Sequence, residues 1–323
     1  MSDFRGVMAY LVSPIDAFGN VKEGVLGHLC DSLIAGGING LTPLGSTGEF
    51  PYLNQSQRNR MVEVTVEAAA GRVPVIPGVS ATTPAGAVAQ AKTYQSLGAA
   101  GILLTLEVYF PLNEFQIEAY FRAVADAIDL PIIIYTNPTF QKFSLSIDLV
   151  ERLSSHPKIV GLKDASTNTG RLLSILNRVG DRLDVFAASS HIPLSVMMMG
   201  GKGWLAGPAC IFPAASAELY RLCVSGEWSK AGDLQKVLWA ANEIFERYGL
   251  AACVKAGLEE RGFPVGDPMF PLVPLNHDER AKVREVIRDI DLLTMVGKHG
   301  SSQLTSLRPQ GDEQPTPAPR LLA

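Results

Sequence analysis

The sequence predicts an α/β fold, a (β/α)8 TIM barrel followed by a C-terminal helical extension. Short apolar runs alternate with longer helical patterns about eight times over residues 1–226, the number of units that closes such a barrel. Runs such as residues 131–135 are nearly continuously apolar, which is typical of parallel strands buried on both faces. An open doubly wound sheet is the competing fold, but when it binds a dinucleotide it carries a GxGxxG turn after its first strand. No such turn follows the first run.

The individual elements follow from this alternation of patterns. The predicted strands are, in chain order, residues 6–12, 38–43, 73–78, 101–105, 131–135, 159–163, 183–187 and 202–206. The predicted helices that follow them are residues 23–35, 55–70, 84–97, 114–128, 147–154, 169–179, 192–199 and 213–225. In the first helix, Leu26, Leu29 and Leu33 fall at helical spacing and form its apolar face.

After Gly226 only helical patterns occur, at residues 228–248, 251–261 and 278–296. We expect residues 1–226 to form the barrel and residues 227–296 to form helices packed beside it or between subunits. Residues 297–323 are rich in Ser, Gln, Pro and Gly and offer little to bury, which predicts a disordered tail.

Composition restricts the class of protein. The chain has 323 residues, of which 47% are hydrophobic and only 19% are charged, which excludes a disordered chain. The net charge of −4, without a basic cluster, argues against nucleic acid or a membrane surface as a partner. The N-terminus lacks the features of a secretory signal, and no apolar run approaches the length that spans a bilayer. We therefore expect a cytoplasmic protein, with free buried thiols at Cys30, Cys210, Cys223 and Cys253.

Two polar residues end neighbouring predicted strands, where the active face of such a barrel lies. Lys163 closes the run Ile159–Lys163, and Tyr135 closes residues 131–135. A lysine or tyrosine after a strand is by itself more often a boundary or packing residue. In a dry barrel mouth, however, desolvation lowers the pKa of an amine and makes it a nucleophile toward a ketone. A phenol on the adjacent strand could then carry protons during the reaction.

A glycine-flanked turn, Gly45-Ser46-Thr47-Gly48-Glu49, follows the second predicted strand. Its exposed amides and two hydroxyls make a good receptor for a carboxylate, although such a turn is commonly only a turn. It lacks the lysine and the spacing of a phosphate-binding Walker loop. We expect Glu49 to brace the loop rather than to react.

These three motifs, in this order and spacing, resemble the dihydrodipicolinate synthase/N-acetylneuraminate lyase family. They are Gly-Ser-Thr-Gly-Glu at residues 45–49, Tyr-x-x-Pro at 135–138 and Gly-Leu-Lys-Asp at 161–164. The resemblance covers about residues 4–296 and leaves out the tail. It implies a class I, metal-independent lyase on a (β/α)8 barrel, usually a homotetramer built as a dimer of dimers.

The resemblance also implies roles for individual residues. Lys163 matches the lysine that forms a Schiff base with C2 of pyruvate or another 2-oxo acid, so that no cofactor is needed besides this covalent imine. Tyr135 matches the proton-relay tyrosine, and Ser46 and Thr47 match the pair that holds the carboxylate, with Thr47 often joining the relay. Tyr109 falls where a neighbouring subunit contributes a tyrosine. Leu205 matches a position whose backbone carbonyl lies near the lysine.

At two places the sequence departs from the family pattern. Dihydrodipicolinate synthases carry an arginine two residues after the proline of Tyr-x-x-Pro, where this chain has Phe140, which has no donor for an anion. The segment 188–191 is closer to the serine-bearing segment of 4-hydroxy-2-oxoglutarate aldolases. We expect Phe140, Ser189 and His191 to line the distal substrate pocket.

The sequence therefore predicts a Schiff-base-forming aldolase or dehydratase acting on pyruvate or a 2-oxo (3-deoxy) acid through Lys163. The five histidines show no HxxxH or HExxH spacing, which disfavours a zinc-dependent class II aldolase and predicts no metal site. Two alternatives stay open. One is 4-hydroxy-tetrahydrodipicolinate synthase of lysine biosynthesis, and the other is a non-catalytic 2-oxo-acid-binding regulatory protein on the same scaffold.

Overall fold

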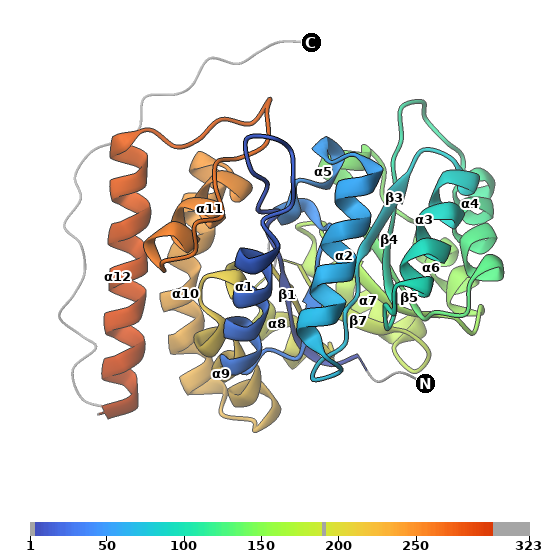
Figure 1. Ribbon diagram of the computed structural model, residues 1–323. Helices are drawn as coiled ribbons and strands as arrows, with labels where there is room; N and C mark the ends of the chain where they lie inside the picture. Colours follow the sequence, from blue (N-terminus) through green and yellow to red (C-terminus); the bar gives the residue numbers. More distant parts are fainter. Residues whose placement is uncertain (1–3, 189–191, 300–323) are drawn as a thin grey trace, which may run out of the picture.

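The computed structural model describes residues 4–188 and 192–299, in which eight parallel strands form a nearly closed barrel surrounded by helices (Figure 1). The predicted fold class is thereby confirmed. The strands are β1 (Gly6–Tyr10), β2 (Gly40–Thr42), β3 (Gly78–Ala81), β4 (Ile102–Leu106), β5 (Ile132–Thr136), β6 (Ile159–Asp164), β7 (Asp184–Ala187) and β8 (Gly203–Ala206).

The strands follow one another around the barrel in the order β2-β1-β8-β7-β6-β5-β4-β3. The segment that precedes β3 closes the ring: Leu41 forms a parallel bridge with Val75, and Ile76 N donates to Leu41 O at 2.8 Å. The third strand was predicted at residues 73–78, and these bounds were wrong. The regular pairing of β3 with β4 begins only at Gly78. Pro74 and Pro77 lie within residues 73–78 and have no amide hydrogen to donate, so regular pairing starts after them.

The helices of the barrel lie between its strands and cover its outer face (Figure 1). They are α1 (Glu23–Ala35), α2 (Gln55–Ala69), α3 (Pro84–Ser96), α4 (Glu114–Ala127), α6 (Ile147–Ser154), α7 (Thr169–Val179), α8 (Pro193–Met198) and α9 (Pro213–Val224). Asn54 and Asn113 each form a capping box with the glutamine three residues later, which starts α2 and α4 at these positions. The short helix α5 (Pro138–Gln141), directly after β5, has no counterpart among the predicted elements.

The core has two layers. The larger cluster packs the outer faces of the strands against the helices, and it includes Trp204. A smaller cluster fills the barrel interior with residues such as Met8, Tyr10, Phe186 and Leu205. This interior is apolar, so that a charged group placed within it is removed from water at a high free-energy cost.

Three further helices follow the barrel, α10 (Trp228–Tyr248), α11 (Leu250–Glu260) and α12 (His277–His299). Helix α10 packs against α9, and α12 packs on the outer side of α10 and α11 (Figure 1). Residues 297–299, assigned to the tail by the sequence, are part of α12, so the predicted helix end was three residues early. Residues 300–323 lie outside the described residues. No helix in the described part of the chain is long and apolar enough to cross a membrane.

Candidate active site

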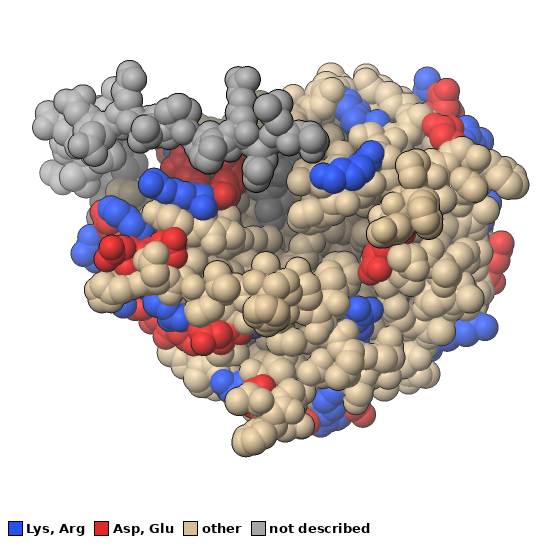
Figure 2. Space-filling model, turned by 90° about the horizontal axis from the view of Figure 1, so that it is seen from above, with Lys and Arg blue, Asp and Glu red and all other residues tan. Residues whose placement is uncertain are grey.

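The carboxyl ends of the strands meet at the top of the barrel in Figure 1, and Figure 2 looks down on this end. Lysine, arginine, aspartate and glutamate side chains lie next to one another around the periphery of the face. Uncharged residues make up most of its described surface. The face that carries the predicted site residues is therefore not dominated by charge of one sign.

Lys163 lies near the end of β6, and its side chain is buried in the barrel interior. Its Nζ donates to Tyr10 Oη at 2.8 Å and lies 4.0 Å and 4.3 Å from the ring centroids of Tyr10 and Tyr135. Burial lowers the pKa of Lys163 from 10.5 to about 7, because the apolar surroundings disfavour the charged form. The lysine is therefore available as a neutral amine near neutral pH, as a nucleophile must be.

Tyr135 lies beside Lys163, as predicted, because β5 pairs with β6 in a register that places their Cα atoms opposite each other. Its Oη lies 3.5 Å from Ser46 Oγ and accepts a hydrogen bond from Asn137 Nδ2 at 3.1 Å. Burial raises the pKa of Tyr135, which keeps the phenol protonated at neutral pH. The phenol thus connects the lysine side of the site with the loop that carries Ser46.

The glycine-flanked loop that begins with Gly45 is held in a strained conformation. Leu44 and Glu49, on either side of it, have φ values of 62° and 53°, a region that non-glycine residues rarely adopt. A Cβ on Gly45 would lie 2.8 Å from ring carbons of Tyr10, and one on Gly48 would lie 2.9 Å from Leu11 O. The glycines therefore allow the loop to pack directly onto β1. Backbone strain of this kind is concentrated at functional sites.

This loop leaves hydrogen-bonding groups free for a ligand. The amides of Gly48 and Glu49 bond within the loop, to Gly45 O and Ser46 O. The amides of Ser46 and Thr47 bond to no described residue, and the buried Thr47 Oγ1 also has no partner in the described part of the chain. Buried polar groups are normally paired, so such a set indicates a place for a ligand. Two adjacent amides and two hydroxyls fit a carboxylate.

Glu49, the last residue of the motif, is fully engaged. Its carboxylate lies 2.6 Å from Lys255 Nζ of α11 and accepts a hydrogen bond from Met269 N at 2.6 Å. Lys255 also donates to Asp267 O at 2.8 Å, and both side chains of the ion pair are buried. These contacts attach the loop to the C-terminal helices, in agreement with the expectation that Glu49 braces the loop.

Tyr10 was not identified from the sequence, although its hydroxyl accepts a hydrogen bond from Lys163 Nζ. It lies at the end of β1 in a run that reads as a plain apolar strand. A tyrosine facing an apolar interior needs a partner for its hydroxyl, and this was the available signal. The partner could not be inferred, because β8 and β7 separate β1 from β6 in the ring.

Of the other predicted site residues, one is buried near Lys163, two lie on the surface and two are not described. Leu205 is buried inside the barrel on β8, opposite Met8 of β1, in the cluster that surrounds Lys163. Tyr109 is 86% exposed and makes an edge-to-face contact with Phe110, so in a single chain it lies on the surface. Phe140 is exposed on α5. Ser189 and His191 lie outside the described residues.

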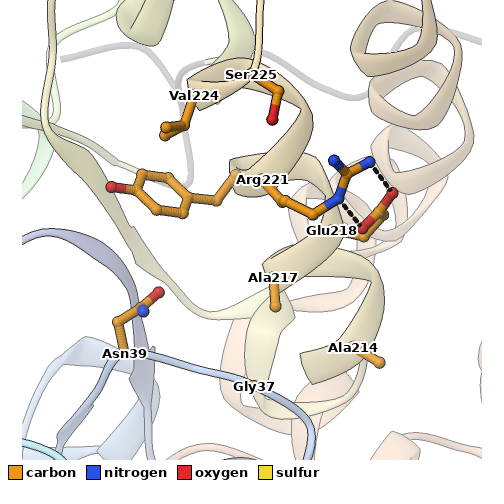
Figure 3. A pocket seen from close by; sticks show the side chains of 9 residues that line it. Gly37, Asn39, Ala214, Ala217, Glu218, Arg221, Val224 and Ser225 are labelled. Carbon is orange, nitrogen blue, oxygen red and sulfur yellow. Dashed lines mark hydrogen bonds and ion pairs between the residues drawn. The ribbon is translucent and has the colours of Figure 1, made fainter. Parts of the chain in front are cut away.

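A separate open hollow of about 420 Å³ lies away from this site, between α9 and the segment that leads into β2 (Figure 3). Glu218 and Arg221, the two ionic residues among those that line it, pair with each other at 2.8 Å. Asn39 also lines it, and its Oδ1 accepts a hydrogen bond from Val7 N at 2.9 Å. Because these polar groups are already paired, the hollow does not compete with the barrel mouth as a catalytic site. Among the described residues, no group of three or more His, Cys, Asp or Glu could hold a metal ion.

Comparison with known proteins places the chain among relatives of one family. The model of the Dihydrodipicolinate synthetase family matches residues 3–290. The chain is 33% identical over 290 residues to the 4-hydroxy-tetrahydrodipicolinate synthase of Acidiphilium cryptum (strain JF-5), covering 90% of this chain and 99% of the relative. The corresponding protein of Phenylobacterium zucineum (strain HLK1) is 31% identical over 290 residues, covering 90% of this chain and 98% of the relative.

Solved structures give the same result. The dihydrodipicolinate synthase of Agrobacterium tumefaciens str. C58 superposes with a TM-score of 0.84 at 28% identity, covering 90% of this chain and 99% of that one. The chloride-inhibited dihydrodipicolinate synthase of Acinetobacter baumannii, complexed with pyruvate, has a TM-score of 0.84 at 26% identity, covering 89% and 99%. The predicted class of enzyme, a Schiff-base-forming lyase, is confirmed by this relationship. The chain belongs to the dihydrodipicolinate synthetase family.

Proposed function

We propose that the protein joins Lys163 to C2 of pyruvate or a related 2-oxo acid as an imine and catalyses aldol cleavage, aldol condensation or dehydration of that acid. The observation that carries this proposal is the environment of Lys163. Its amine is buried between Tyr10 and Tyr135, and its pKa is lowered to about 7. No cofactor is needed, because the covalent imine itself serves as the electron sink.

The surrounding residues supply the remaining parts of this chemistry. The free amides of Ser46 and Thr47, the unpaired Thr47 hydroxyl and the Ser46 hydroxyl hold the substrate carboxylate and thereby orient C2 toward Lys163 Nζ. The iminium at C2 withdraws electrons and lowers the barrier to removing a proton or a carbon fragment at C3. Tyr135, which is in hydrogen-bond reach of Ser46 and Asn137, carries a proton between the substrate and the loop.

Borohydride trapping tests the proposal. The protein is incubated with pyruvate and sodium borohydride, and the modified residue is located by peptide mass. We expect a reduced pyruvate adduct on Lys163 and none in Lys163→Met. If neither pyruvate nor 2-oxo-3-deoxy sugar acids give an adduct on Lys163, the proposed function is wrong.

A second candidate is 4-hydroxy-tetrahydrodipicolinate synthase, which is favoured by the names of the curated relatives. That reaction needs a cation for the carboxylate of aspartate semialdehyde, whereas Phe140 at the corresponding position is apolar and exposed. We therefore expect little condensation of pyruvate with aspartate semialdehyde, and an increase in Phe140→Arg. Robust synthase activity in the unmodified chain would favour this second candidate instead.

The assembly that we propose is a homotetramer in the cytoplasm, in which Tyr109 contributes to the site of a neighbouring subunit. The support is an exposed aromatic group on one surface, in which Tyr109, Phe110 and Phe115 are each more than 70% exposed. Sedimentation of the protein and of Tyr109→Ala tests this arrangement. A monomer with full activity would contradict it.

A further inference from the structure

The geometry points to Tyr10 as a second catalytic phenol, which carries the proton that imine formation at Lys163 requires. This inference rests on the proposed function and deepens it, because it separates the work of Tyr10 from that of Tyr135. The sequence motifs of the family resemblance do not include Tyr10. Its place in the site follows only from the packing of the barrel.

The first argument is direct contact with the reacting atom. Tyr10 Oη lies 2.8 Å from Lys163 Nζ, and both side chains are buried in the barrel interior. The two residues come from β1 and β6, which are not adjacent in the ring, so Tyr10 reaches the amine across the interior. A group within hydrogen-bond distance of the nucleophile satisfies the geometric requirement for proton transfer.

The second argument is the different engagement of the two phenols. Tyr135 Oη interacts with Ser46 and Asn137, and its ring centroid lies 4.3 Å from the amine. The Tyr10 ring centroid lies 4.0 Å from the amine, and in addition Tyr10 Oη accepts a hydrogen bond from Nζ. The hydroxyl of Tyr135 is thus directed to the carboxylate loop and that of Tyr10 to the carbon–nitrogen bond.

The third argument is that Tyr10 is rigidly placed. Gly45 packs on its ring so closely that an added Cβ would lie 2.8 Å from two ring carbons. The residue that precedes Tyr10, Ala9, pairs with Ala206 of β8, and Tyr10 itself pairs with Thr42 of β2. The carboxylate loop therefore fixes the phenol next to the amine, and no rearrangement is required for the transfer.

Lys163, Tyr10 and the substrate itself supply and accept every proton that the reaction moves. Nζ attacks C2 of the 2-oxo acid, and its proton passes to the former carbonyl oxygen to give a carbinolamine. Tyr10 then protonates that hydroxyl, the C–O bond breaks, water leaves, and the nitrogen lone pair forms the C=N bond. The resulting phenolate is stabilised by the adjacent iminium. It next removes a proton from C3, which yields the enamine and restores the phenol.

The protonation state of Tyr10 in the free enzyme supports this sequence. Burial raises the pKa of Tyr10 well above 10.0, and the nearby Tyr135 raises it further. Among the described residues, the titratable groups that interact with the Tyr10 hydroxyl are Lys163 and Tyr135. Before substrate binds, the phenol therefore carries its proton.

The test compares Tyr10→Phe with Tyr94→Phe, a matched control that removes a buried hydroxyl from α3 in the outer core. Single-turnover borohydride trapping with pyruvate measures imine formation, and exchange of the pyruvate methyl protons in deuterium oxide measures enamine formation. We expect both rates to fall about 10²-fold in Tyr10→Phe and to stay unchanged in the control. Trapping at the unmodified rate in Tyr10→Phe would overturn the inference while leaving the proposed function intact.

A second measurement covers the case in which Tyr10→Phe does not fold, as judged by its thermal unfolding. Replacing Tyr10 by 3-fluorotyrosine preserves the ring and the hydroxyl but lowers the pKa of the phenol. We expect the alkaline limb of the pH profile of trapping, where the phenol loses its proton, to move to lower pH, whereas a purely structural role would leave that limb where it is. If the unmodified protein forms no adduct on Lys163, the proposed function fails and the role of Tyr10 fails with it.

Discussion

Glu49 Oε2 lies 2.6 Å from Lys255 Nζ, in a buried ion pair between the glycine-flanked loop of residues 45–49 and helix α11. The pair lies outside the strands of the barrel, yet it acts on the loop that carries Ser46 and Thr47. Two buried charges require close pairing and further hydrogen bonds to offset their desolvation. Met269 N and Asp267 O provide these bonds. The C-terminal part of the chain thus holds the loop that we propose as the carboxylate receptor.

Replacing Lys255 by Met is expected to lower the free energy of unfolding by about 3–5 kcal/mol, because it leaves the Glu49 carboxylate buried without its cation. Chemical denaturation measures this loss. The control is Lys230→Met, which removes an exposed lysine from its pair with Glu227 and should cost less than about 1 kcal/mol. A loss for Lys255→Met as small as that of the control would show that the pair does not hold the loop.

Replacing Thr47 by Val removes a buried hydroxyl that has no partner in the described structure while preserving the shape of the side chain. We expect stability to be unchanged or slightly higher, because no internal hydrogen bond is lost. Pyruvate binding, measured by the concentration dependence of borohydride trapping, should weaken about 10-fold, because a hydrogen bond to a charged group is lost. Ser216→Ala, at an equally unpaired buried hydroxyl on α9, should leave binding unchanged. Equal affinity in Thr47→Val and the unmodified protein would remove Thr47 from the receptor.

Replacing Tyr135 by Phe is expected to reduce turnover about 10²-fold or more, because the proton relay to the substrate is lost. Formation of the imine should persist, since the Tyr10 hydroxyl still faces the amine. Steady-state turnover and single-turnover trapping on the same preparation distinguish the two effects. Near-normal turnover would exclude Tyr135 from the mechanism.

The rate of imine formation should depend on pH through the amine of Lys163. Burial lowers the pKa of this lysine to about 7. As the pH rises toward that value, the neutral, nucleophilic fraction of the amine increases about tenfold per pH unit, and above it the fraction levels off. Trapping rates at subsaturating pyruvate across this range measure the profile. A rate that instead keeps rising toward 10.5, the usual pKa of lysine, would show that the amine is solvated.

Much of this organisation could be predicted from the sequence, because it depends on local patterns. The alternation of apolar runs and helical spacing identified the barrel, and strand order then made Tyr135 and Lys163 neighbours. The sequence placed the boundaries of β3 too early, because Pro74 and Pro77 interrupt regular strand pairing without changing the apolar pattern.

The sequence by itself determined the type of fold, through its repeated alternation of patterns. It also predicted the nucleophile and the loop for the carboxylate, because each of these lies in a short contiguous segment. Only the tertiary structure decided that Tyr10 contacts Lys163 and that Lys255 holds Glu49. Both contacts join residues that lie far apart in the chain. Closure of the barrel and packing of the C-terminal helices bring them together, and the burial that results also lowers the pKa of the lysine.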